Sequence, residues 1–173
     1  LKETEFKDLF KDETQVKTDK ITFTSDCVID TDLEIHIPES YIGNIAERIR
    51  LYRELDNIKT NDELENFEKH LIDRFGPLPE STIELLKVVR LRWIAIELGF
   101  EKLILKNQKL VLYFIIDQRS AYYSTPVFSN ILTFVQKNPS LFRMKEGKDR
   151  LTMSIDGIQD ISQAMLLLQK MKP

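Results

Sequence analysis

The spacing of hydrophobic and polar residues changes along the chain. From residue 39 to residue 98, apolar residues recur at intervals of three and four, which is typical of amphipathic helices. Outside this stretch, short apolar runs are separated by turn residues, which is typical of strands and hairpins. Separate blocks of helices and mostly hairpin-linked strands predict an α+β fold, in which several helices pack with a small, mostly antiparallel sheet.

Two short apolar runs precede the helical stretch, at residues 21–24 and 33–37. In the second run (LEIHI) every other residue is apolar, so one side of a strand would face the core. Pro38 follows and would end the strand, because proline has no backbone N–H to donate to a sheet. The pattern predicts a half-buried strand over residues 33–37.

Three helices are predicted next, over residues 39–58, 60–75 and 80–98. Each has apolar residues along one side, which would face the core. The positions assigned to these sides are Ile42, Ile45, Ile49, Tyr52 and Leu55 in the first helix, Leu64, Phe67, Leu71, Ile72 and Phe75 in the second, and Ile83, Leu85, Leu86, Val89, Trp93 and Ile96 in the third.

The ends of the second helix are clearly marked. Thr60 and Glu63 have the spacing of a capping box at the start of a helix. Gly76 can adopt the positive φ that commonly follows a helix, and Pro77 cannot continue one. The stretch LIDRFGPLP, residues 71–79, is therefore predicted to contain the end of this helix.

The rest of the chain predicts two hairpins, around the turns KNQK and EGKD, and two further helices. Thr125 and Pro126 suit the cap and the first position of the earlier helix. The predicted strands are 102–105, 110–116, 142–145 and 150–155, and the predicted helices are 126–137 and 158–171.

Composition limits the classes of function. Twenty-five Lys and Arg against 28 Asp and Glu give a net charge of −3, which argues against a bulk electrostatic grip on nucleic acid but leaves a local basic patch open. The longest apolar run, LVLYFII, is far shorter than the roughly 20 residues that span a membrane. Cys27 is the only cysteine, which suits a reducing compartment. We expect a cytoplasmic protein with no membrane contact.

The sequence lacks the motifs of common enzymes. It has no glycine-rich phosphate loop and no HExxH motif, and its two histidines, His36 and His70, stand alone on predicted polar faces. Cys27 follows an acid, and nothing cationic beside it would lower its pKa, so it is interpreted as a buried or inert thiol. We expect no catalytic residue, no metal site and no cofactor in this segment.

Two polar surfaces remain as candidates for binding. Arg48, Arg50 and Arg53 in the first helix offer a possible nucleic-acid site, although interleaved acids favour a solvated face with pairing along the helix. In the second helix, a step of about 100° per residue puts several polar residues opposite the apolar side. These residues are Glu63, Asn66, His70, Asp73 and Arg74. Spacing alone favours a solvated face there too.

Residues 45–103 resemble the C-terminal domain of the bacterial transcription-repair coupling factors (Mfd). The motifs that carry this resemblance are IPESYI (37–42), RLYRELDNIKTNDEL (50–64), LIDRFGPLP (71–79) and LLKVVRLRWIAIELG (85–99). The resemblance implies a C-terminal regulatory domain over residues 21–173. It also implies that residues 1–20 are a linker or helix from the end of a preceding motor region.

In this family the full protein is an ATP-driven DNA translocase that removes stalled RNA polymerase from lesions and recruits nucleotide excision repair. The resemblance implies that ATP and Mg²⁺ act in an upstream motor region, and that RNA polymerase and DNA bind other domains. It implies that this domain is not an enzyme. Its partner would be the N-terminal UvrB-like module of the same protein, where docking masks the surface for UvrA and so inhibits the protein.

The resemblance also changes the interpretation of the second helix. Asp73 and Arg74 match an acid and an arginine that the family uses in this docking contact, and Asn66 and Glu63 lie on the same face. His70 stands where other members can carry a glutamate, so this sequence departs from the pattern there. The implied protein interface comprises Asp73, Arg74, His70, Asn66 and Glu63.

Overall fold

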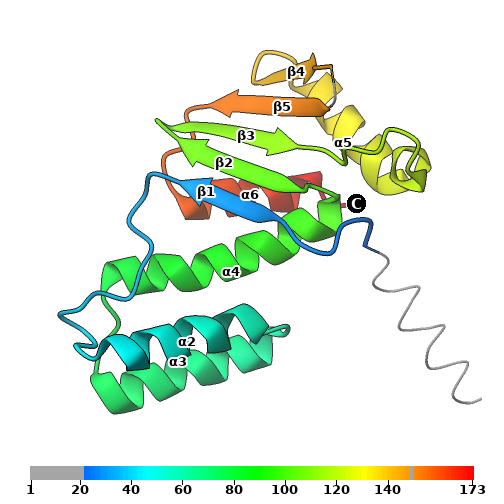
Figure 1. Ribbon diagram of the computed structural model, residues 1–173. Helices are drawn as coiled ribbons and strands as arrows, with labels where there is room; N and C mark the ends of the chain where they lie inside the picture. The colour runs from blue at the N-terminus through cyan, green and yellow to red at the C-terminus, as the bar shows by residue number, and fades with distance from the viewer. Residues whose placement is uncertain (1–21, 149) are drawn as a thin grey trace, which may run out of the picture.

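A computed structural model describes residues 22–148 and 150–173 of the chain. In these residues, five α-helices accompany one five-stranded sheet, which confirms the predicted α+β fold (Figure 1). The strands are β1 (Val28–Thr31), β2 (Lys102–Lys106), β3 (Lys109–Tyr113), β4 (Phe142–Glu146) and β5 (Leu151–Asp156). The helices are α2 (Ile45–Asn57), α3 (Asn61–Phe75), α4 (Glu80–Leu98), α5 (Pro126–Lys137) and α6 (Ile161–Met171), with a short 3-10 helix η1 (Ala121–Ser124) before α5.

The sheet has the order β1-β2-β3-β5-β4. Only the β1–β2 pair is parallel, and the other three pairs are antiparallel, so the sheet is mostly antiparallel as predicted. Helices α4, α5 and α6 cover one face of it (Figure 1). The strand residues buried against these helices include Leu103, Leu105, Leu110, Leu112, Met153 and Ile155.

Helix α4 lies between the sheet and the α2–α3 pair (Figure 1). Leu86 and Val89 belong to a small apolar core with α2 and α3, whereas Leu91 and Ala95 belong to the larger core under the sheet. A helix that contacts partners on two sides must be apolar on both, which explains its broad apolar surface. No helix in the described part of the chain is long and apolar enough to span a membrane.

The helix ends predicted from local signals are confirmed. The Thr60 hydroxyl accepts a hydrogen bond from the Glu63 N–H at 3.2 Å, and Gly76 adopts a φ of +89° at the end of α3. The Thr125 hydroxyl caps α5, with Pro126 as its first residue. These contacts are made within four residues of chain, so short motifs suffice to predict them.

The predicted strand over residues 33–37 is wrong. The first strand is β1, and the backbone of residues 33–37 runs past the helices instead: the His36 N–H donates to Ser81 O, and the Ile37 N–H donates to the Tyr52 hydroxyl at 2.7 Å. The alternation in burial is real, since Ile37 is buried and His36 exposed. This alternation reflects packing against the helices. Alternation alone does not make a strand, because a strand also needs hydrogen bonds to a neighbouring strand. The other predicted run, 21–24, is not a strand in residues 22–24, and residue 21 lies outside the described residues.

The predicted first helix began too early, and its core face was predicted only in part. Residues 39–41 form a turn, in which the Tyr41 N–H bonds to Pro38 O, and α2 begins only after its N-cap Asn44. Of the residues assigned to its core face, Ile42 and Leu55 are buried as predicted, but Ile45 and Ile49 are 65% and 46% exposed. The helix also buries Leu51, which was not assigned to that face. Ile72 and Ile83, also assigned to core faces, are exposed as well.

Candidate functional site

All five residues of the predicted interface line one groove between α2 and α3. The groove consists of two adjoining hollows, of about 380 and about 480 Å³, which share Glu54, Phe67 and His70. Asp73 and Arg74 border the first hollow. Glu63 and Asn66 border the second. We call this surface the α2–α3 groove.

The floor of the α2–α3 groove is apolar and firmly held. Leu51, Phe67 and Leu71 are at most 5% exposed and belong to the small core. At the C-terminal end of α3, the Tyr41 hydroxyl donates to Gly76 O at 2.7 Å and to Leu71 O at 3.1 Å. Gly76 directly follows the last residue of α3, so these contacts join the end of the helix to Tyr41.

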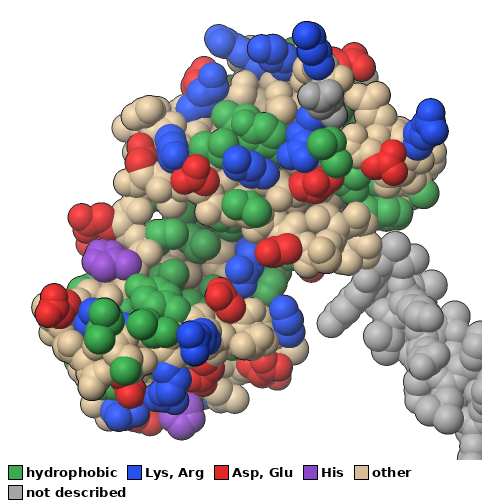
Figure 2. Space-filling view, viewed as in Figure 1, with side chains coloured by type: hydrophobic (Ala, Val, Ile, Leu, Met, Phe, Trp, Pro, Cys, Tyr) green, Lys and Arg blue, Asp and Glu red, His purple; other side chains and the backbone are tan. Residues whose placement is uncertain are grey.

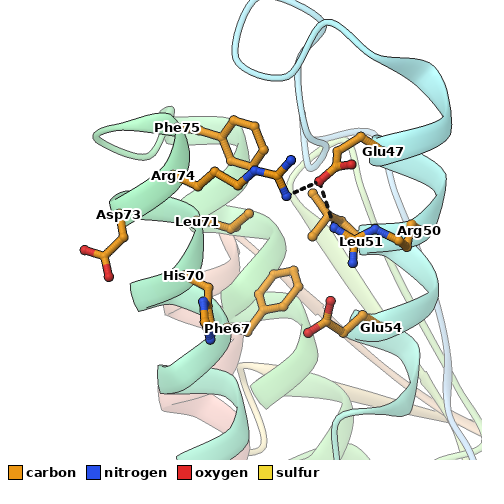
Figure 3. A pocket seen from close by; sticks show the side chains of 10 residues that line it. All are labelled: Glu47, Arg50, Leu51, Glu54, Phe67, His70, Leu71, Asp73, Arg74 and Phe75. Atoms are coloured by element: carbon orange, nitrogen blue, oxygen red, sulfur yellow. Dashed lines mark hydrogen bonds and ion pairs between the residues drawn. The ribbon is translucent and has the colours of Figure 1, made fainter.

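The rim of the groove is charged, and its centre is an ion-pair network. Arg74 Nη1 lies 2.8 Å from Glu47 Oε1, and Arg50 Nη2 lies 2.7 Å from the same oxygen (Figure 3). The hydrogen bond from Arg50 has the largest effect and holds the pKa of Glu47 below its usual value. Burial opposes it, and the charges of Arg50 and Arg74 each lower the pKa by a smaller amount. Arg74 also lies over the ring of Phe75, 5.1 Å from its centre.

This network is exposed, with 62% of the Arg74 side chain and 59% of the Arg50 side chain accessible to solvent. Exposed pairs stabilise a fold weakly, because water screens the charges and long side chains lose freedom. The Arg74 guanidinium can therefore leave Glu47 for another carboxylate at little cost.

The other predicted residues differ in how they are used. Asp73 projects away from Glu47 (Figure 3), and it is exposed without an ion pair to any described residue. Glu63 is partly engaged in the cap of α3, where its carboxylate accepts a hydrogen bond from the Lys59 N–H at 3.3 Å. His70 and Asn66 are exposed on the rim.

Sequence reasoning missed the contribution of α2 to this site. Glu47, Arg50 and Glu54 border the groove. Arg50 was considered only for nucleic-acid binding or as part of a solvated face, and the interleaved acids only as part of that face. The interleaved acids did indicate pairing along the helix, and one such pair, Glu47 with Arg50, is present. Nothing in the sequence indicated that Arg74, 27 residues away, would join it.

The alternative nucleic-acid site on α2 is partly occupied by contacts within the domain. Arg48 Nη1 donates to Ile42 O at 2.6 Å, and Arg50 pairs with Glu47. Two of the three guanidinium groups considered for phosphate binding thus have carbonyl or carboxylate partners on the same helix or beside it.

Cys27 is buried, as predicted, with 1% of its surface exposed. Burial, then the charge of Asp26, raises its pKa to about 12 against the lowering effect of Arg92. A thiol with this pKa is protonated at neutral pH, and the thiolate is the nucleophilic form.

In residues 22–148 and 150–173, no three His, Cys, Asp or Glu side chains are grouped as metal ligands.

Comparison with known proteins places this groove in a family. The family model described as TRCF domain matches residues 31–125. The chain is similar to the transcription-repair-coupling factors of Escherichia coli, at 32% identity over 73% of the chain, and of Rickettsia prowazekii, at 31% identity over 68%. It spans about 10% of the length of each.

A solved structure has the same fold. The crystal structure of the C-terminal domain of transcription-repair coupling factor matches with a TM-score of 0.67 and 15% identity, covering 84% of this chain and 91% of that one. The family model covers α2, α3 and α4 together with β2 and β3, and so includes the whole α2–α3 groove. This chain belongs to the TRCF domain family, the family of the transcription-repair coupling factors of DNA repair.

Proposed function

We propose that this chain is a non-enzymatic, autoinhibitory interaction domain. It docks on an N-terminal UvrB-like module of its own protein and masks the surface that UvrA binds. RNA polymerase, DNA, ATP and Mg²⁺ are engaged by other domains of that protein, in the cytoplasm. Release of the docked domain exposes the UvrA site.

The gathering of five residues in the α2–α3 groove carries this proposal. Glu63, Asn66, His70, Asp73 and Arg74 come from one helix, and the structure adds acids and a base from α2 on the opposite rim. A fixed apolar floor with a charged rim is the usual anatomy of a protein interface. No described residue covers the exposed Asp73 with an opposite charge.

The weakness of the rim contacts suits a surface that must open. Arg74 has a partner within the domain, so docking exchanges Glu47 for a carboxylate of the partner and gains only the difference. Asp73 gives up no ion pair with a described residue when the domain docks, so an ion pair with a cation of the partner would be a new contact. We expect Asp73 to contribute more to docking than Arg74.

The test is a double variant of the full-length protein, Asp73→Ala with Arg74→Ala. Docking should weaken, and UvrA should bind the variant more tightly than the wild type, because the domain is undocked, and the UvrA site exposed, for a larger fraction of the time. UvrA affinity is measured by titration against the immobilised full-length protein. The single variants should rank with Asp73→Ala above Arg74→Ala.

A matched control removes one acid and one base from other exposed positions of the same helix. Glu65→Ala with Lys69→Ala deletes one acid and one base from exposed positions that border neither hollow of the groove. This control should bind UvrA as the wild type does. Equal UvrA affinity in wild type and the Asp73/Arg74 variant would remove the docking role from this groove.

A further inference from the structure

The second face of the sheet is not covered by any described helix (Figure 1). The strand register places alternate residues on this face, which we call the open sheet face. One row across β2, β3, β5 and β4 consists of Lys102, Tyr113, Thr152 and Lys145. The next row, which begins on β1, consists of Asp30, Ile104, Val111, Ser154 and Arg143.

Positive charge is concentrated at one end of the open sheet face. Lys102, Arg143 and Lys145 form no ion pair with a described residue. Lys102 Nζ and Arg150 Cζ lie 5.7 and 5.6 Å from the centre of the Tyr113 ring, which holds both cations over the sheet. Arg150 alone of these four has an acidic partner, Glu101, at 3.4 Å.

The other end of the same face is electrically balanced. Lys106 pairs with Asp30 at 3.0 Å, and Lys109 lies opposite Asp156 in the register of β3 and β5. The chain as a whole carries a net charge of −3. The positive end is therefore a local basic cluster on a protein with a negative net charge. The composition argued against nucleic-acid binding by overall charge, but it was compatible with a local basic patch of this kind.

Apolar side chains lie beside these cations. Ile104 and Val111 are partly exposed in the middle of the open sheet face. Three strand intervals of about 4.8 Å separate the backbones of Lys102 and Lys145 by about 14 Å, so the two lysines stand on either side of the centre of the face. Figure 2 shows Lys and Arg side chains around hydrophobic ones over the sheet, in the upper half of the molecule.

We propose that the open sheet face binds single-stranded nucleic acid. Lys102, Arg143 and Lys145 contact phosphates, and unpaired bases lie over Ile104 and Val111. The hydroxyl group of Ser154, between the cations, donates to a phosphate oxygen as such groups commonly do, whereas the Thr152 hydroxyl donates to Lys145 O at 3.4 Å. This site is separate from the α2–α3 groove and does not depend on the proposed docking.

The shape of the face favours a single strand over other polyanions. A duplex hides the faces of its bases, so it cannot lay them over Ile104 and Val111, whereas each unpaired base of a single strand has an exposed face. An acidic peptide would satisfy the cations but would leave the apolar centre without a flat partner. A single strand supplies both the phosphates and the apolar base faces.

The test measures binding of a fluorescent single strand of roughly 12 nucleotides to the whole chain by anisotropy, between roughly 50 and 200 mM salt. In the variant Lys102→Gln with Lys145→Gln, two phosphate contacts are lost. The slope of log K against log salt should then fall by about 1.4, and affinity near 0.1 M salt by about 25-fold. The far-ultraviolet circular dichroism spectrum checks that the variant is folded.

The matched control, Arg53→Gln with Lys69→Gln, removes two charges from the helical pair and should bind as the wild type does. A duplex of the same length and polyglutamate should compete more weakly than the unlabelled single strand. The proposal is overturned if the wild type does not bind, if the control loses as much affinity as the sheet variant, or if the duplex or polyglutamate competes equally well. A loss confined to the control would instead place binding on the α2–α3 pair.

Discussion

Arg74, in the last turn of α3, lies 2.8 Å from Glu47, in the first turn of α2. The acid stands at a helix N-terminus and the base at a helix C-terminus. Each therefore has a charge opposite in sign to that end of its helix dipole, which is a favourable interaction. The arginine of the motif LIDRFG is therefore joined to its own domain before any partner arrives. A docking partner must compete with Glu47 for it.

The Glu47 pair should make stability depend on pH in one direction. Because the pKa of this carboxyl is lowered in the folded state, its contribution is present above the unfolded value of about 4.3 and is lost as pH falls through the folded pKa. Glu47→Gln should therefore lower the free energy of unfolding slightly at neutral pH and not at all well below pH 4. Urea unfolding at a series of pH values measures this.

Salt provides the control for that experiment. The charges are exposed, so the difference between wild type and Glu47→Gln at neutral pH should shrink in roughly 1 M salt, where the Debye length is about 3 Å. A difference that is unchanged by both acid and salt would mean that Glu47 acts through packing and not through its charge.

The floor of the groove should be far more important to stability than its rim. Leu71 is 1% exposed, and Leu71→Ala should cost about 2–5 kcal/mol, because it removes buried methyl groups and leaves a cavity. The neighbouring Ile72 is 42% exposed, and Ile72→Ala should cost well under half as much. Denaturant unfolding of the two variants measures the contrast. Equal costs would show that Ile72, as its place in the sequence pattern suggested, is a core residue.

Local signals in the sequence were sufficient for α3 and α4. The cap at Thr60 and the glycine at position 76 fix the ends of α3 through contacts of a few residues, and the observed α4 has the predicted bounds. The helical period then put the five polar residues of α3 on one surface. That part of the groove could be predicted because a single helix determines it.

Contacts between distant segments could not be predicted in the same way. Val28 pairs with Lys102 in the parallel β1–β2 ladder, and no periodicity in either segment specifies that partner. Ile45 and Ile49 have the spacing of a core face, but the positions of α3 and α4 decide which side of α2 is covered. The α2 rim of the groove was missed for the same reason.

The thiol of Cys27 should resist alkylation in the folded protein. Its pKa of about 12 leaves almost no thiolate at pH 8, and its burial excludes the reagent. Labelling with iodoacetamide should be slow in buffer and should become fast in denaturant, where the pKa returns to about 8.5. Mass spectrometry of timed samples measures both rates. Rapid labelling without denaturant would show that the segment around β1 opens locally.

The two helix-ending glycines should differ sharply when replaced by alanine. Both have a positive φ, +89° for Gly76 and +84° for Gly99, so both variants are strained. A Cβ at Gly76 meets nothing within 4 Å, and Gly76→Ala should cost about 1–3 kcal/mol from backbone strain alone.

A Cβ at Gly99 would lie 2.2 Å from Cε1 of Tyr122, a ring that is fully buried and whose hydroxyl donates to Leu98 O at 2.7 Å. The ring cannot move away without breaking that bond and the packing around it. Gly99→Ala should therefore cost clearly more than Gly76→Ala in thermal or denaturant unfolding. Equal costs for the two variants would mean that Tyr122 can shift freely, against its position in the core. The expected smaller cost at Gly76 would show that, within LIDRFGPLP, this glycine acts through its backbone conformation alone.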